Sequence, residues 1–208
     1  MTTLYFRNGT CALGPHIALE WMGASYEAVV APAGSAELLA MNASGAVPVL
    51  KEDDGWVLTQ AGAILRYLLI KHPDSGLGGE DGARGQAELE RWICFLTGDL
   101  HPAFFPVFMP DRYTTDQSDD AKAKVVEAGI GLVRKNLRLL DAQLEGKEWI
   151  LGPRSVADAY AFPMIRWARA KLPDGLAAYT NVLALYDRLA ADPAVQRTLK
   201  FQAEAKAP

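Results

Sequence analysis

Cys11 is the side chain in this sequence that is best placed to act as a nucleophile. It lies between a short apolar segment, residues 4–6, and a segment expected to be helical over residues 15–22. The unpaired N–H groups and the positive dipole end of a helix N-terminus favour a thiolate over a thiol. Cysteine is also among the most buried residue types. The local sequence therefore allows both a reactive thiol and a small buried hydrophobe.

Cys94 is the second of only two cysteines. Their separation provides neither a disulfide framework nor the paired Cys-x-x-Cys spacing of metal ligands, so no metal site is expected. Gly14 occupies the position of the second cysteine in a Cys-x-x-Cys redox motif, so disulfide chemistry at Cys11 needs an external thiol. The apolar neighbours of Cys94 predict that it is buried.

The composition predicts a globular protein without a nucleic-acid or membrane partner. The chain has 208 residues, half of them hydrophobic, enough for one large domain or two small ones. The 21 Lys and Arg residues against 25 Asp and Glu give a net charge of −4, which provides no basic surface for nucleic acid or an anionic membrane. We find neither a signal peptide nor a membrane span, and expect a cytoplasmic protein.

The first part of the chain alternates strand and helix patterns. Strands are expected over residues 4–6, 26–30, 47–50 and 56–58, and helices over residues 15–22, 36–41 and 60–71. A parallel crossover followed by an antiparallel hairpin at residues 53–55 gives a four-stranded mixed sheet, as in a thioredoxin-like fold. Glycine-rich residues 74–85 predict a linker. The first domain is expected to span residues 1–75.

The remainder, residues 84–208, is expected to form an all-helical domain. Apolar residues recur at helical spacing in two stripes: Val126, Ile130, Val133, Leu137, Leu140 and Leu144, and then Tyr179, Val182, Leu183, Tyr186 and Leu189. Ser155 and Asp158 form a capping-box pattern at the start of another helix. The fold class is therefore α/β plus all-α, with the thioredoxin-like domain first.

Five segments, taken together, resemble the cytosolic glutathione transferases, most closely the bacterial beta type. They are residues 9–19 (GTCALGPHIAL), 42–50 (NASGAVPVL), 58–65 (LTQAGAIL), 100–108 (LHPAFFPVF) and 155–158 (SVAD). They span nearly the whole chain in the family's order. The resemblance implies a homodimeric detoxification enzyme that takes glutathione as co-substrate and a small hydrophobic electrophile as its second substrate.

The resemblance assigns four residues of the first domain to glutathione. The Val47-Pro48 peptide is expected to be cis and to present the Val47 backbone to the cysteinyl part of glutathione, like an added strand. An ordinary trans proline at a strand edge is the alternative. Gln60 and Ala61 open a helix whose N–H groups suit the γ-glutamyl carboxylate. The family usually has Ser at position 61, and Ala61 lacks its hydroxyl.

The resemblance places His101, in the long first helix of the second domain, opposite Cys11 across the domain cleft; a structural role at a helix kink before Pro102 is the alternative. Phe104, Phe108 and Trp167 match positions that line the electrophile pocket, although aromatic residues at helical spacing are also typical of a core. Where the family often has Asn and Ser or Thr as further contacts to glutathione, this chain has Cys94 and Gly98.

These features favour a transferase that conjugates glutathione to electrophiles, with Cys11 and His101 as its catalytic residues. A thiol-disulfide oxidoreductase acting through a mixed disulfide of glutathione and Cys11 is one alternative. A ligand-binding protein that keeps the fold without efficient catalysis is another, because Ala61, Cys94 and Gly98 each remove a polar group that the family offers to glutathione.

Overall fold

A four-stranded mixed sheet forms the amino-terminal part of the computed structural model, which describes residues 1–207. The strands are β1 (Thr2–Phe6), β2 (Tyr26–Val30), β3 (Val49–Lys51) and β4 (Val57–Thr59), arranged in the order β2-β1-β3-β4. β1 pairs parallel with β2 and antiparallel with β3, and β3 pairs antiparallel with β4. The predicted mixed sheet is confirmed.

Three helices belong to this part: α1 (Leu13–Met22), α2 (Ala36–Met41) and α3 (Ala61–Lys71). α1 begins two residues earlier than predicted, and Pro15 is tolerated because it lies in the first turn. α3 begins one residue later than predicted, because Gln60 has φ 70° and cannot join the helix.

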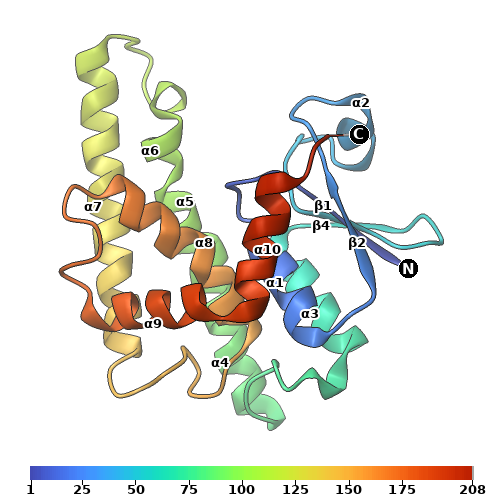
Figure 1. Ribbon diagram of the computed structural model, residues 1–208. Coiled ribbons are helices and arrows are strands. Elements are labelled where there is room, and N and C mark those ends of the chain that lie inside the picture. Colours follow the sequence, from blue (N-terminus) through green and yellow to red (C-terminus); the bar gives the residue numbers. More distant parts are fainter. Residues whose placement is uncertain (208) are drawn as a thin grey trace.

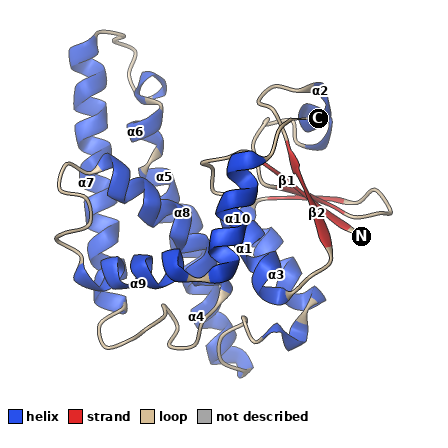
Figure 2. Cartoon of the chain, viewed as in Figure 1, coloured by secondary structure: helices blue, strands red, loops and turns tan. Residues whose placement is uncertain are grey.

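The rest of the chain is helical, as Figure 2 shows. Its helices are α4 (Gly82–Phe95), α5 (His101–Ala103), α6 (Phe105–Phe108), α7 (Asp119–Gln143), α8 (Val156–Lys171), α9 (Thr180–Ala191) and α10 (Pro193–Glu204). α10 returns to pack along α1, so the end of the chain lies against the sheet half (Figure 1). None of the helices described combines the length and the apolarity that a membrane span requires.

The helical run that begins with α4 changes its winding just before His101. Residues Leu96–Leu100 form a π-helix, and Pro102 has no N–H to continue an α-helical ladder. The side-chain amide of Asn136 on α7 donates to Asp99 O at 3.0 Å and so satisfies one carbonyl of this turn. His101 therefore lies in the same helical run as α4, as predicted, although the π-turn interrupts the α-helical winding and α5 begins at His101.

α8 is the central helix of the second half, and its first residues are buried on every side. Ser155 Oγ accepts a hydrogen bond from Ala157 N at 3.3 Å, and Asp158 accepts one from Ser155 N at 2.8 Å. The Asp158 carboxylate also accepts from Ile150 N at 2.9 Å, which fixes the preceding loop. The predicted capping box is confirmed.

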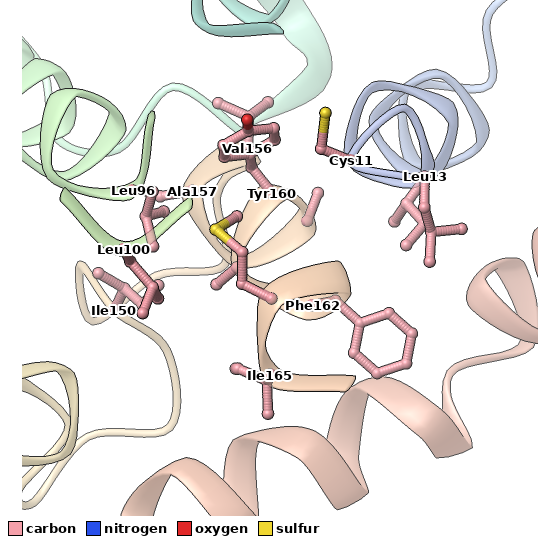
Figure 3. Close-up of a cluster of buried hydrophobic side chains, with 14 of the residues drawn as sticks. Cys11, Leu13, Leu96, Leu100, Ile150, Val156, Ala157, Tyr160, Phe162 and Ile165 are labelled. Atoms are coloured by element: carbon pink, nitrogen blue, oxygen red, sulfur yellow. The ribbon is translucent and has the colours of Figure 1, made fainter. Parts of the chain in front are cut away.

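Gly14 allows α1 and α8 to pack at very short range. A Cβ atom at position 14 would lie 2.7 Å from Tyr160 Cδ2 and 2.9 Å from Tyr160 Cα. Because a packed interior does not yield by such amounts, any side chain here would push the helices apart. Figure 3 shows the buried cluster that results, with Cys11 and Leu13 beside Tyr160 and Phe162. Position 14 therefore serves helix packing.

His16 is a buried polar side chain where α1 meets α10. It is 2% exposed, and its Nδ1 accepts a hydrogen bond from Gln202 Nε2 at 3.0 Å. The ring centroids of Phe6, Tyr26 and Phe201 each lie 5.5 Å from the centroid of its imidazole. This burial lowers the pKa of His16 to about 4. The folded protein therefore holds His16 neutral.

Acid is expected to weaken the fold through His16. Because this group titrates near 6.5 when unfolded and near 4 when folded, the unfolded chain binds its proton first as the pH falls. Between these pH values the free energy of unfolding should decrease by about 3 kcal/mol from this group. In urea titrations a His16→Gln variant, although less stable at neutral pH, should lack this part of the decrease. His72→Gln is the control at a side chain that is not buried, and an equal change of slope in both variants would contradict the assignment.

Candidate active site

A cleft of about 720 Å³ opens between the sheet half and the helical half of the protein. The sheet half contributes the loop before α1, the segment before β3 and the start of α3. The helical half contributes α4, the π-helix, α5, the start of α6 and α8. Six of the residues predicted for catalysis or ligand binding line this cleft: Cys11, Val47, Pro48, Gln60, Ala61 and His101. The fold thus brings together residues that are up to 90 positions apart in the sequence.

The segment before β3 presents its backbone to the cleft. The Val47-Pro48 peptide bond is cis, as predicted. Val47 lies ahead of the first paired residue of β3, Val49, so its backbone is outside the hydrogen-bond ladder of the sheet. Val47 O accepts a hydrogen bond from Cys11 Sγ at 3.7 Å. The thiol and the free backbone segment are therefore in direct contact.

The N-terminus of α3 opens into the same cleft. Gln60, directly before it, has φ 70°, a left-handed conformation that is costly for a residue with a side chain. Ala61 begins the helix, whose first N–H groups have no acceptor within the helix. Such a helix start binds anions. One turn further on, Arg66 pairs with Glu90 (Nε to Oε1, 3.3 Å) and donates to Gln86 Oε1 at 2.6 Å.

Cys11 is only 7% exposed and lies two residues before α1. Burial raises the pKa of its thiol to about 11, and this outweighs the lowering by a hydrogen bond from Tyr160 and by the positive charge of Arg7. The helix N-terminus, which favours a thiolate, is therefore outweighed at Cys11, because the loss of hydration is the larger effect. At neutral pH Cys11 is a thiol and a hydrogen-bond donor.

Tyr160 on α8 connects Cys11 with His101. Its Oη lies 3.1 Å from His101 Nδ1 and within hydrogen-bonding reach of Cys11. Burial lowers the pKa of His101 to about 4, so its imidazole is neutral, and its Nδ1 shares a hydrogen bond with the Tyr160 hydroxyl. Burial also raises the pKa of Tyr160, which keeps the hydroxyl protonated. His101 therefore reaches Cys11 through Tyr160.

Tyr160 and Phe105 also line the cleft, although the sequence assigned no site role to either, and Phe105 lies within the 100–108 segment. Tyr160 lies in a run of small and apolar residues. A buried tyrosine hydroxyl usually has a hydrogen-bond partner. Phe105 follows His101 by four residues, and their rings lie 5.0 Å apart between centroids. Helical spacing from His101 is the signal that would have found it.

The three residues predicted for an electrophile pocket form one aromatic cluster. Ring centroids are 5.8 Å apart for Phe104 and Phe108, and Trp167 lies 5.4 Å from each. Phe104 is fully buried, so it supports the cluster from behind, whereas Phe108 is 39% exposed. Trp167 also lies 5.3 Å from His101, and its indole N–H donates to Gly9 O at 3.0 Å. The cluster therefore adjoins the cleft through His101.

Cys94 lies at the rim of the cleft and is exposed. The prediction that it is buried is wrong, because α4 turns Trp92 and Ile93 inward and Cys94 outward. Thr97 is the nearby hydroxyl on the cleft wall, and it donates to Ile93 O at 2.8 Å. Gly98, the next residue, is exposed and has no side chain to contact a ligand.

Comparison with known proteins gives the same family over both halves of the chain. The model of the glutathione S-transferase N-terminal domain matches residues 15–76, and that of the C-terminal domain matches residues 99–193. Glutathione S-transferase GST-4.5 of Xanthomonas campestris is 37% identical over 96% of this chain and 98% of its own length. Glutathione S-transferase GstA of Escherichia coli O157:H7 is 31% identical over 96% of this chain and 98% of its own length.

Solved structures agree with this assignment. A glutathione S-transferase from Xylella fastidiosa superposes with a TM-score of 0.91 at 35% identity, covering 98% of this chain and 99% of its own. A sphingomonad glutathione S-transferase in complex with glutathione gives a TM-score of 0.84 at 35% identity, covering 98% and 100%. The beta-class enzyme of Sphingomonas chungbukensis gives 0.84 at 35% identity, covering 96% and 98%. This chain belongs to the glutathione S-transferase family and resembles its bacterial beta-class members.

Proposed function

We propose that this protein conjugates glutathione to small hydrophobic electrophiles. The observation that carries the proposal is one cleft in which the free backbone of Val47, the start of α3 and the Cys11–Tyr160–His101 group meet. Glutathione extended along Val47 places its γ-glutamyl carboxylate at Ala61 and its thiol beside Cys11. The related sphingomonad enzyme, which holds glutathione in its structure, supports this assignment.

The two halves of the chain divide the work in this proposal. Residues 1–75 form the glutathione-binding domain, with Val47, Pro48, Gln60 and Ala61 as contacts. Residues 84–208 form the domain that binds the electrophile and provides dimer contacts. Phe108 and Trp167 have exposed surface next to His101, and a wall of aromatic rings suits flat apolar electrophiles.

Catalysis depends on hydrogen bonds to the sulfur of glutathione. Because Cys11 is protonated, its S–H can turn from Val47 O to the sulfur of bound glutathione, and the neutral imidazole of His101 offers a ring N–H. Donors favour the thiolate of the bound thiol over the protonated form, and each pKa unit gained is worth about 1.4 kcal/mol. The cleft also holds the thiolate next to the electrophile, which replaces a bimolecular encounter.

Burial of Cys11 argues against the oxidoreductase alternative. A mixed disulfide requires the Cys11 thiolate to attack a disulfide, and burial disfavours that thiolate. The exposed Cys94 is the other thiol on the cleft wall. Both cysteines are free, which suits a reducing compartment, and we infer that the protein is cytoplasmic.

Exposed apolar side chains support a homodimer. Leu132 and Leu139 are 49% and 51% exposed and lie two helical turns apart on α7. On the sheet half, Trp56 and Ile70 are 45% and 67% exposed. Apolar surface on both halves suits an interface in which the first domain of one subunit packs against the second domain of its partner.

Binding of glutathione is the direct test of the proposal. Titration calorimetry of the wild-type protein should show binding at millimolar concentration or below, and an Ala61→Ser variant should bind about tenfold more tightly, because its hydroxyl adds a hydrogen bond to the carboxylate. Ala36→Ser is the matched control, since Ala36 is also the first residue of a helix but does not line the cleft. Absence of binding by the wild-type protein would refute the conjugating and the redox function together. Binding without conjugation of an electron-poor aryl halide would leave the ligand-binding alternative.

The two thiols are expected to differ in reactivity. At neutral pH iodoacetamide should modify exposed Cys94 first and Cys11 on the order of a hundredfold more slowly, because burial withholds its thiolate. Mass spectrometry of Cys11→Ser and Cys94→Ser variants separates the two rates. Faster labelling of Cys11 than of Cys94, or a glutathione adduct confined to Cys11 under oxidising conditions, would restore the redox function.

A charged side chain at position 139 is expected to break the dimer. Sedimentation velocity should give a dimer for the wild-type protein and a monomer for Leu139→Arg, because the new charge loses its hydration in the interface. Leu39→Arg is the control, since Leu39 is 44% exposed and lies on α2, a helix that carries none of the four side chains assigned to the interface. A monomeric wild-type protein would disprove the assembly.

A further inference from the structure

A second cavity, separate from the cleft, lies where α1, the edge strand β2 and α10 meet. We call it the α10 cavity; its walls include His16 and Glu20 of α1, Tyr26 of β2, and Arg197 and Phe201 of α10. Its volume is about 580 Å³, which is within the range of sites for small molecules. The two sets of lining residues have no member in common. The proposed reaction therefore leaves this cavity without a role.

His16 brings an unpartnered hydrogen-bond donor to the α10 cavity. Because its Nδ1 accepts from the side-chain amide of Gln202, the neutral ring carries its proton on Nε2. Within residues 1–207, this Nε2 has no hydrogen-bond partner. Over the same residues, Trp92 Nε1 is the only fully enclosed side-chain nitrogen or oxygen that lacks a partner. The Nε2–H of His16 is therefore not fully enclosed, and the open space that His16 lines is the α10 cavity.

Apolar side chains surround this single donor. The rings of Tyr26 and Phe201 meet the imidazole of His16 edge to face, at interplanar angles of 87° and 80°. Ala28 and Val29 of β2 add aliphatic surface to the wall. Phe201 is 46% exposed, so a large apolar ring lies at the open side of the cavity. Aromatic walls with one polar group are typical of sites for flat apolar molecules.

The charges around the α10 cavity disfavour an anionic ligand. Glu20 accepts a hydrogen bond from Tyr26 Oη at 2.7 Å and pairs with Arg197 at 3.2 Å, so these two charges offset each other. Glu27 is exposed on the wall and has no ion-pair partner in the described part of the chain. Its carboxylate repels a second anion. An ammonium group has no lone pair to accept from His16. An uncharged acceptor therefore fits best.

We propose that the α10 cavity binds a small, flat, uncharged aromatic molecule with a hydrogen-bond acceptor at one edge. The acceptor bonds to the Nε2–H of His16, and the ring packs against Tyr26 and Phe201. Because β2 and α10 are far apart in the chain, a ligand that contacts both also holds the last helix on the sheet half. The site is independent of the proposed binding of glutathione, which uses none of these residues.

Quinoline is the probe, because it is flat, uncharged at neutral pH and has one acceptor, its ring nitrogen. The protein has 3 histidines: His16 lines the α10 cavity, His101 lines the cleft and His72 lines neither. In proton–nitrogen correlation spectra of the histidine rings, recorded on the full chain without glutathione, quinoline should shift the His16 signals to saturation. Naphthalene has the same shape without the nitrogen, and it should bind about threefold to tenfold more weakly at His16.

A pair of variants locates the binding. Phe201→Ala should weaken quinoline at His16 by about tenfold, because a wall of the cavity is lost. Phe108→Ala is the matched control: it removes a ring of similar exposure from the aromatic cluster next to His101, and it should leave the His16 titration unchanged.

Three results would overturn the inference: His16 signals that quinoline does not move, equal affinity for quinoline and naphthalene, or equal effects of the two variants. A shift of the His101 signals alone would place quinoline in the cleft and would likewise overturn it. The wild-type titration requires no variant, so it remains decisive even if Phe201→Ala does not fold. Glutathione is absent from these titrations, so their failure leaves the proposed function untouched.

Discussion

The close contact between α1 and α8 at Gly14 is the constraint on which the site depends. Only a hydrogen atom fits between the Gly14 Cα and the backbone of Tyr160. This contact brings a hydroxyl of the second half within reach of a thiol of the first half. Two polar interactions hold α8 in the same place: the Asp158 capping box at its start and the bond from Trp167 to Gly9 O near its end. The packing of α1 against α8 therefore fixes the position of Tyr160 relative to Cys11.

Burial, more than charge, sets the chemistry of the cleft. It raises the pKa values of Cys11 and Tyr160 and lowers that of His101, so all three groups are neutral at pH 7. A site of neutral donors stabilises an anion that arrives with the ligand, without a competing anion of its own. The formal charges on the cleft wall are those of Arg66 and Glu90, which pair with each other.

Local patterns in the sequence predicted the fold well, because each element has its own signal. The hairpin at residues 53–55, the capping box at Ser155 and the end of the first helix at Met22 depend on residues next to each other in the chain. The motif around Val47-Pro48 predicted its cis bond correctly.

What the sequence could not predict depends on contacts between distant segments. The pKa of Cys11 depends on how completely α8 covers it, and the partner of His101 comes from a residue 59 positions away. Whether Cys94 is buried depends on the rotation of α4, and its apolar neighbours did not reveal that rotation. Phe104 and Phe105 are adjacent, yet only the structure shows which of them faces the cleft.

The π-helix of residues Leu96–Leu100 has a consequence for how His101 is aimed. A π-turn is equivalent to one residue inserted into an α-helix, and one residue corresponds to a rotation of about 100° around the helix axis. The direction of His101 relative to α4 is thus encoded by the number of residues between them as well as by their identity. A homologue with one residue fewer here would have a regular helix and a histidine that faces another wall. Chain length in this turn is therefore a criterion, separate from the presence of the histidine, for recognising family members that share this geometry.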